Sequence, residues 1–190
     1  MEKFESFKNF ITENAKIKNA CSGELNRAIQ SKDIDGLLNV IKDNAIWCYN
    51  SKIISIEIFE KYVEADILFK NGIYIKRAID KINTDNTYIL MGSTVNKIHG
   101  SSTVKFMSDS STVNEMSDSS TVNEMYGSST VNKMSGSSTV KFMSDSSTVN
   151  KMSGSSTVNK MYDSSTYRTF KYGEKPKIYI TKNAFDIIEL

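Results

Sequence analysis

Residues 92–172 carry two apolar columns with a fixed period of nine residues. The first column consists of Val95, Val104, Val113, Val122, Val131, Val140, Val149 and Val158, with Tyr167 in the ninth copy. The second column follows three residues later and consists of Ile98, Met107, Met116, Met125, Met134, Met143, Met152, Met161 and Phe170. The register never slips, which is typical of repeat proteins whose units bury apolar side chains by stacking on their neighbours.

The nonapeptide fits a β-strand better than a helix. Two apolar residues in nine cannot line one face of a 3.6-residue period, and Ser, Thr and Val disfavour helix. In an extended unit such as SSTVNEM, the second Ser and the Val point inward, while the first Ser, the Thr and the Asn point outward. Asn then allows a bend, Met returns to the interior, and Gly or Asp forms the corner. Two nonapeptides therefore predict one coil of 18 residues in a parallel β-solenoid.

The differences between copies also have a period. The segment SSTVKFMSD at 101–109 recurs verbatim at 137–145, which indicates duplication of a two-coil block. Every second copy places an asparagine after the valine, which predicts an amide ladder of Asn96, Asn114, Asn132 and Asn150. The alternative interpretation is disordered low-complexity sequence, because the segment is rich in Ser. It is disfavoured, because an unselected linker has no reason to keep Val and Met in one phase.

Residues 1–91 are predicted to form a mainly helical domain that caps one end of the solenoid. Apolar residues recur at helical spacing near the start, at Phe4, Phe7, Ile11 and Ala15. Ser22 is expected to cap a second helix, and Asp33 or Asp35 a third. Residues 53–69 suit either a further helix or a helix followed by a strand. The strand GIYIK, 72–76, is predicted after the turn at Asn71.

Residues 173–190 break the repeat and are predicted to cap its other end. The segment holds the single proline, Pro176, then an alternating run and an expected turn at Lys182. This pattern favours a hairpin over a strand followed by a helix, and either would cover an open sheet edge. The sequence therefore predicts an α+β protein with a helical domain (1–91), a short parallel β-solenoid (92–172) and a C-terminal β cap (173–190).

Composition and charge exclude several classes of protein. The chain is 39% hydrophobic and 24% charged, with a formal net charge of +2. No segment is basic enough to predict nucleic-acid binding or acidic enough to predict a DNA mimic. The charged start, MEKFESFKNFITENAK, is unlike a signal peptide, and no apolar run is long enough for a membrane span. We expect a soluble, cytoplasmic protein with free thiols at Cys21 and Cys48.

Residues that carry enzyme chemistry are sparse. His99 is the single histidine and, with two distant cysteines, does not predict a zinc site. The corners lack the Gly-Gly-x-Gly-x-Asp turn of calcium-binding nonapeptide rolls, and common nucleotide and hydrolase motifs are absent. An enzyme would need Cys48 or the carboxylates of 57–66, yet a buried thiol and a solvated helix face are the commoner explanations. We predict no catalytic site, cofactor or metal.

Two outward features are candidate binding surfaces. Ladders of Ser, Thr and Asn suit ice or carbohydrate, although such residues are also ordinary on a solvent-facing strand. The second feature is an aromatic and basic patch on one side, with Phe at solvent-facing positions, which suits contact with a protein or a nucleic acid. The patch consists of Lys105, Phe106, Tyr126, Lys141, Phe142 and Tyr162.

The SSTVNEM and SSTVNKM units after a helical region resemble uncharacterised nonapeptide-repeat proteins encoded by bacteriophages and other mobile elements of gut bacteria. The resemblance covers about half of the chain. It implies a small β-solenoid in a bacterial cytoplasm that acts on a host protein, and it carries no catalytic residues. In outline the repeats are also similar to pentapeptide-repeat proteins, some of which present a DNA-like surface. The near-neutral repeats of this chain depart from that pattern.

The leading hypothesis is a non-enzymatic protein-interaction module that binds and modulates a host protein. A defence or restriction component is one candidate target, and the helical region is expected to supply either homodimerisation or the specific contact. The alternative hypothesis is a ligand-binding solenoid that uses its Ser/Thr/Asn ladders for ice or carbohydrate. A third hypothesis is an enzyme that uses Cys48 or the carboxylates of the helical region.

Overall fold

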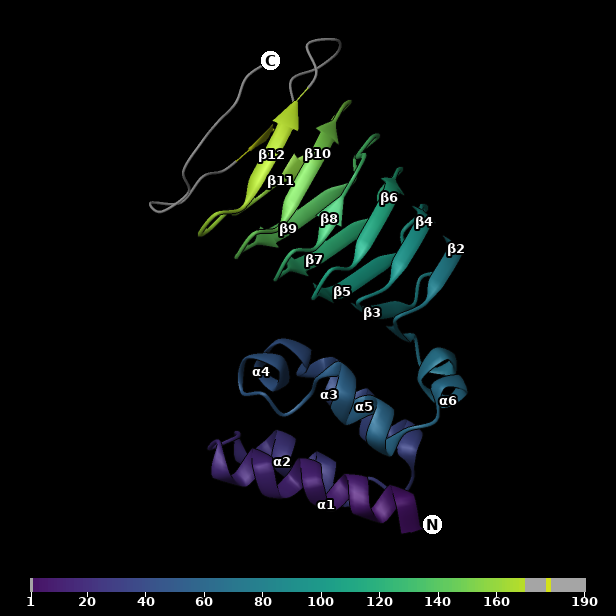
Figure 1. The fold of residues 1–190 in the computed structure, drawn as a ribbon, viewed down its shortest axis with the longest axis vertical. Helices are drawn as coiled ribbons and strands as arrows, with labels where there is room; N and C mark the ends of the chain where they lie inside the picture. Colours follow the sequence, from purple (N-terminus) through teal and green to yellow (C-terminus); the bar gives the residue numbers. More distant parts are fainter. Residues whose placement is uncertain (1, 170–176, 179–190) are drawn as a thin grey trace. The chain divides into compact units, whose positions relative to one another are not determined.

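The computed structural model describes residues 2–169 and 177–178, which belong to two compact units, Met1–Ile73 and Tyr74–Leu190 (Figure 1). Six helices come first along the described chain, and parallel strands wound into a β-solenoid follow. The predicted fold class is confirmed for these residues. Most of the predicted C-terminal cap, 173–190, lies outside the described residues. Lys177–Ile178 form strand β13, which pairs with β11.

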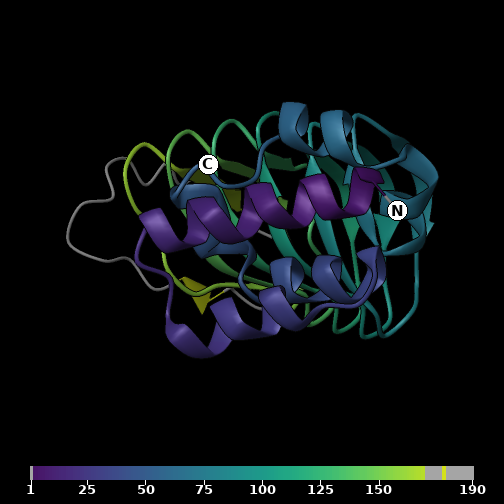
Figure 2. The same cartoon turned by 90° about the horizontal axis from the view of Figure 1, so that it is seen from below.

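The helical unit is built around the apolar face of its first helix. Its helices are α1 (Glu2–Ile17), α2 (Ser22–Gln30), α3 (Ile34–Asp43), α4 (Ala45–Asn50), α5 (Ile56–Tyr62) and α6 (Ala65–Lys70). Helix α1 lies beside α2 (Figure 2) and also packs against α5. The fully buried ring of Phe7 lies 6.4 Å from that of Phe59 and 5.5 Å from that of Tyr62, between ring centroids. The predicted stripe on the first helix is thus the core of this unit.

The helix starts agree with the sequence prediction in part. Asp33 caps α3, because its side chain accepts a hydrogen bond from the backbone N–H of Gly36 at 2.8 Å. Ser22 is the first residue of α2 rather than its N-cap, because the chain enters this helix through Cys21, which makes no side-chain cap bond. Residues 53–69 contain two helices and no strand. Ser55 caps the first of these by accepting from the N–H of Ile58 at 3.2 Å.

The strands alternate between two parallel sheets, so that each coil contributes one strand to each sheet. The sheet we call sheet A contains β1 (Ile73–Ile75), β3 (Thr87–Met91), β5 (Thr103–Ser108), β7 (Thr121–Met125), β9 (Thr139–Met143), β11 (Thr157–Val158) and β13. Sheet B contains β2 (Ala78–Ile82), β4 (Thr94–Ile98), β6 (Thr112–Met116), β8 (Thr130–Val131), β10 (Thr148–Met152) and β12 (Thr166–Thr169).

Corresponding residues of successive coils lie side by side. Val113 pairs with Val95 below it and with Val131 above it, which confirms the coil of 18 residues. Sheets A and B begin before the first nonapeptide. Thr94 pairs with Ala78, and β3 pairs with β5, so strands β1 to β3 supply one and a half non-repetitive coils ahead of residue 92.

The interior of the solenoid consists of the two predicted apolar columns and a column of small polar residues. The first column is buried from Val95 to Tyr167 and the second from Ile98 to Met161, and together they form one continuous cluster. Tyr74, Ile82, Tyr88 and Leu90 extend this cluster below the repeats. The second Ser of each repeat is also fully buried, as predicted. Ser120 Oγ donates to the carbonyl of Ser117 at 2.8 Å, whereas the buried hydroxyls of Ser129, Ser138, Ser147 and Ser156 have no hydrogen-bond partner. Serine thus fits this position largely by its small size.

The corners of the coils lie at the Gly or Asp that ends each repeat, as predicted, and their backbone is left-handed, a conformation that Gly adopts freely and Asp tolerates. Their φ angles lie between 55° and 68°, at Gly100, Asp109, Asp118, Gly127, Gly136, Asp145, Gly154 and Asp163. Figure 2 shows the successive corners as rows of loops. Some corner carboxylates also bind the coil below. Asp118 Oδ2 accepts from the N–H of Gly100 at 3.0 Å, and Asp145 Oδ2 accepts from that of Gly127 at 2.8 Å.

Gly136→Ala is expected to destabilise the solenoid more than Gly100→Ala. Both glycines have positive φ, so alanine costs about 1–2 kcal/mol at either position. A Cβ on Gly136 would lie 2.9 Å from the backbone nitrogen of Asp118, whereas a Cβ on Gly100 meets nothing within 4 Å. Relieving that contact adds about 1–3 kcal/mol at Gly136 alone. Urea unfolding followed by circular dichroism measures both variants, and equal losses would contradict the close stacking of the corners.

Candidate partner-binding surface

Four aromatic rings form a continuous column along sheet A, outside the interior cluster, in which each ring is tilted by 31° to 40° to the next. The centroid distances are 5.7 Å from Phe106 to Tyr126, 5.6 Å from Tyr126 to Phe142 and 4.9 Å from Phe142 to Tyr162. We call these four residues the aromatic ladder. The phenylalanines come two residues after the valine of their repeat and the tyrosines four residues after it. Rings from two different positions of the nonapeptide therefore meet in one column.

Burial differs along the aromatic ladder. Tyr126, Phe142 and Tyr162 are half-buried, but Phe106 is 0% exposed, so the prediction that Phe106 faces solvent is wrong. The reason lies in its neighbours. Phe106 is in register with Ile89, which is also fully buried, and Tyr126 stacks against it from the next coil. Strand β3 is apolar at nearly every position, unlike the strands of the repeats. The accessible part of the ladder therefore begins at Tyr126.

Charged side chains flank the aromatic ladder. Of the predicted lysines, Lys105 is half-buried and Lys141 is exposed. The structure adds Lys160, which is exposed, and Glu124, which is in register with Phe142. The sequence prediction missed both residues. They occupy the same position of the coil as Phe106 and Phe142, because residues 106, 124, 142 and 160 are spaced by 18.

Glu124 is held by the ladder itself. The hydroxyl of Tyr126 donates to Glu124 Oε2 at 2.8 Å. Partial burial raises the pKa of the Glu124 carboxyl above its ordinary value, and the hydrogen bond from Tyr126 lowers it in part. Tyr126 therefore has two structural roles, because its ring stacks between two phenylalanines while its hydroxyl binds a carboxylate of the preceding strand.

Sheet B carries the predicted amide ladder. The Nδ2 of Asn114 donates to the Oδ1 of Asn96 at 3.0 Å, that of Asn132 to Asn114 at 2.9 Å, and that of Asn150 to Asn132 at 2.8 Å. A column of charged residues runs beside this ladder, in which Lys133 Nζ lies 3.3 Å from Glu115 Oε1. The outer face of sheet B therefore combines amides with paired charges.

The groups considered for chemistry are not part of these two ladders. Cys21 is exposed, whereas Cys48 is buried, and burial raises the pKa of its thiol to about 12. His99 Nδ1 lies 3.9 Å from Asp118 Oδ2 at a corner of the solenoid. Among residues 2–169 and 177–178, no three His, Cys, Asp or Glu side chains are grouped to hold a metal ion. No helix in the same residues has the length and apolar character needed to cross a bilayer.

The fold and the surface define a parallel β-solenoid of nonapeptide repeats with a separate helical unit. No known protein family, curated protein or solved structure matches the chain.

Proposed function

We propose that the protein is a non-enzymatic interaction module that binds another protein through the accessible part of the aromatic ladder. The observation that carries this proposal is the unbroken column of aromatic rings along sheet A, which is partly exposed from Tyr126 to Tyr162. In the other valine-containing copies the same two positions carry Lys or Glu and Ser or His, so the rings are not needed to build a coil. Tyrosine and other aromatic residues are enriched at protein interfaces and often contribute most of the binding energy.

The proposal extends to the kind of partner. The resemblance of the repeats to proteins of bacteriophages and mobile elements supports a bacterial host protein, such as a defence or restriction component. The exposed lysines beside the ladder, Lys141 and Lys160, favour a partner surface that presents carboxylates. A cytoplasmic location and a homodimer through the helical unit stay predictions from the sequence.

Ligand binding by polar ladders has less support. The amide ladder of sheet B is regular, as a flat face for ice or carbohydrate would require. It lies beside charged residues such as Lys133 and Glu115, however, and sheet A carries bulky rings. Neither face is a uniform array of small polar groups.

Capture of a partner from bacterial lysate tests the proposal. The full chain is compared with a Phe142→Ala/Tyr162→Ala double variant and with Lys141→Glu, which keeps every ring. We expect the wild type to retain one protein in an amount close to its own, and both variants to retain at least tenfold less. Thermal unfolding of each variant by circular dichroism shows whether the solenoid is intact.

Lys133→Ala is the matched control, because Lys133 is half exposed on sheet B, away from the aromatic ladder. It should retain the partner as the wild type does. A protein retained equally by all variants, or no retained protein with any of them, would rule out the aromatic ladder as the binding surface.

A further inference from the structure

The helical unit contains a cavity of about 400 Å³. Helices α1, α2, α3 and α4 and the turn between α1 and α2 supply its walls. The walls are mostly apolar and include Ile11, Ala15, Leu25, Ala28, Val40 and Ile41. An apolar cavity of about 150 Å³ already binds benzene, so this one has room for a molecule of about two or three rings.

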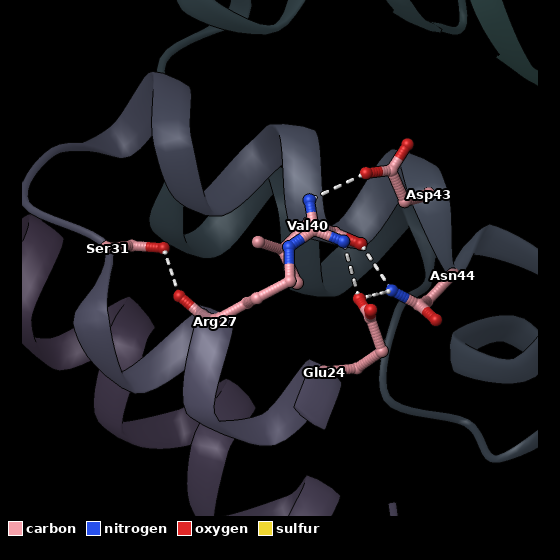
Figure 3. A network of polar contacts seen from close by, with 6 residues as sticks. All are labelled: Glu24, Arg27, Ser31, Val40, Asp43 and Asn44. Carbon is pink, nitrogen blue, oxygen red and sulfur yellow. Dashed lines mark hydrogen bonds and ion pairs between the residues drawn. The ribbon is translucent and has the colours of Figure 1, made fainter. Parts of the chain in front are cut away.

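One part of the cavity wall is polar, and its hydrogen bonds leave two acceptors unused. Glu24 Oε2 accepts from Asn44 Nδ2 and from Arg27 Nη1, both at 2.7 Å (Figure 3). The same Asn44 nitrogen donates to the carbonyl of Val40 at 2.9 Å. Within the described part of the chain, nothing donates to Glu24 Oε1 or to Asn44 Oδ1. Glu24 and Asn44 both line the cavity, so its wall contains one carboxylate and one amide.

The charge of the wall selects the kind of ligand. Glu24 is the one charged residue among those that line the cavity. The neighbouring guanidinium of Arg27 is shared with Asp43, at 2.8 Å, and is not part of the lining. Burial raises the pKa of the Cys48 thiol in the wall to about 12, so this thiol is neutral and acts as an apolar surface. A cation with N–H donors therefore complements the site, and an anion does not.

We propose that this cavity binds a small apolar amine, whose hydrocarbon body fills the apolar part while its protonated nitrogen donates to Glu24 and Asn44. The size of the cavity fits a body of two or three rings. The two unused acceptors match the N–H donors of an ammonium group. This activity goes beyond protein binding by the solenoid, because the residues that line the cavity all belong to the helical unit.

Trp47 gives a direct measurement of binding. It is the single tryptophan of the chain, it lines the cavity, and it is 36% exposed. The full chain is titrated with 1-adamantylamine and, separately, with adamantane-1-carboxylate, which has the same three-ring cage and the opposite charge. Neither probe absorbs near the tryptophan band. We expect the amine to change Trp47 fluorescence saturably and to bind at least tenfold more tightly than the carboxylate, with calorimetry confirming both affinities.

Two variants and one control complete the test. Glu24→Gln should lower the affinity for the amine at least tenfold and leave that for the carboxylate unchanged or stronger. Val40→Phe places a larger side chain in the cavity and should weaken binding of the amine at least tenfold without lowering the melting temperature. Glu13→Gln, at an exposed position of α1 outside the cavity, should behave as the wild type. No saturable binding, equal affinity for both probes, or an amine affinity that either variant leaves unchanged would overturn the proposal.

Discussion

Met125→Ala is expected to lower the free energy of unfolding of the solenoid by about 2–5 kcal/mol. Met125 is fully buried and lies in register between Met107 on one side and Met143 on the other. Removing the Met125 side chain opens a gap in the methionine column of sheet A. Each coil contributes one methionine to this column, so no other side chain is placed to fill the gap. Most of the loss is therefore a cavity that the neighbouring coils cannot close without leaving their register.

Urea unfolding followed by circular dichroism measures this loss. Lys141→Ala is the matched control, because Lys141 is exposed on the next strand of sheet A and should change stability by no more than about 0.5 kcal/mol. A loss below about 1 kcal/mol for Met125→Ala would show that the column relaxes around the gap, against the close packing of a protein interior.

Phe7→Ala is expected to destabilise the helical unit by about 3–5 kcal/mol. The ring of Phe7 is fully buried and packs against Phe59 and Tyr62, so it joins α1 to α5. Such aromatic pairs stabilise the folded state by more than the burial of their surface alone. The stacked rings of Phe10 and Tyr62, at 5.2 Å between centroids, also join the two helices, so losing the Phe7 ring should weaken their contact without removing it.

Trp47 lies in the same unit, so its fluorescence follows the unfolding of this unit during denaturation. Ile17→Ala serves as the control, because Ile17 is 73% exposed at the end of the same helix. Its expected change is within about 0.5 kcal/mol. If both variants unfolded at the same urea concentration, Phe7 would not be the central residue of this core.

The repeat region was the more predictable part of the fold. The repeats have a fixed period of nine residues, with Val and Met in constant phase. Once the unit is interpreted as a strand, this period leaves few alternatives for the fold of the region. The inward serines, the corners at Gly or Asp and the amide ladder of Asn96 to Asn150 were all predicted from it, whereas the left-handed backbone of the corners was not. The starts of the helices were less predictable, because Ser22 and Cys21 differ by one residue and tertiary packing decides where a helix begins.

The candidate surface was predicted in composition but not in arrangement. Phe106 and Tyr126 occupy different positions of the nonapeptide. Aligning the repeats position by position therefore does not predict that the two rings are in contact. Their stacking depends on where the strand bends, which the sequence does not show. The burial of Phe106 depends on strand β3, which lies outside the repeats and follows no period. The cavity near Glu24 has no sequence signature, because it arises from four helices.

The in-register coils have a consequence for how this chain can change over generations. DNA that encodes near-identical units is itself repetitive, so slippage or recombination can add or remove whole units without changing the reading frame. Losing an odd number of nonapeptides would move every later strand to the opposite sheet and break both side-chain ladders. Losing an even number would keep each strand in its own sheet. Selection on the outer surface should therefore leave length variants that differ by whole coils.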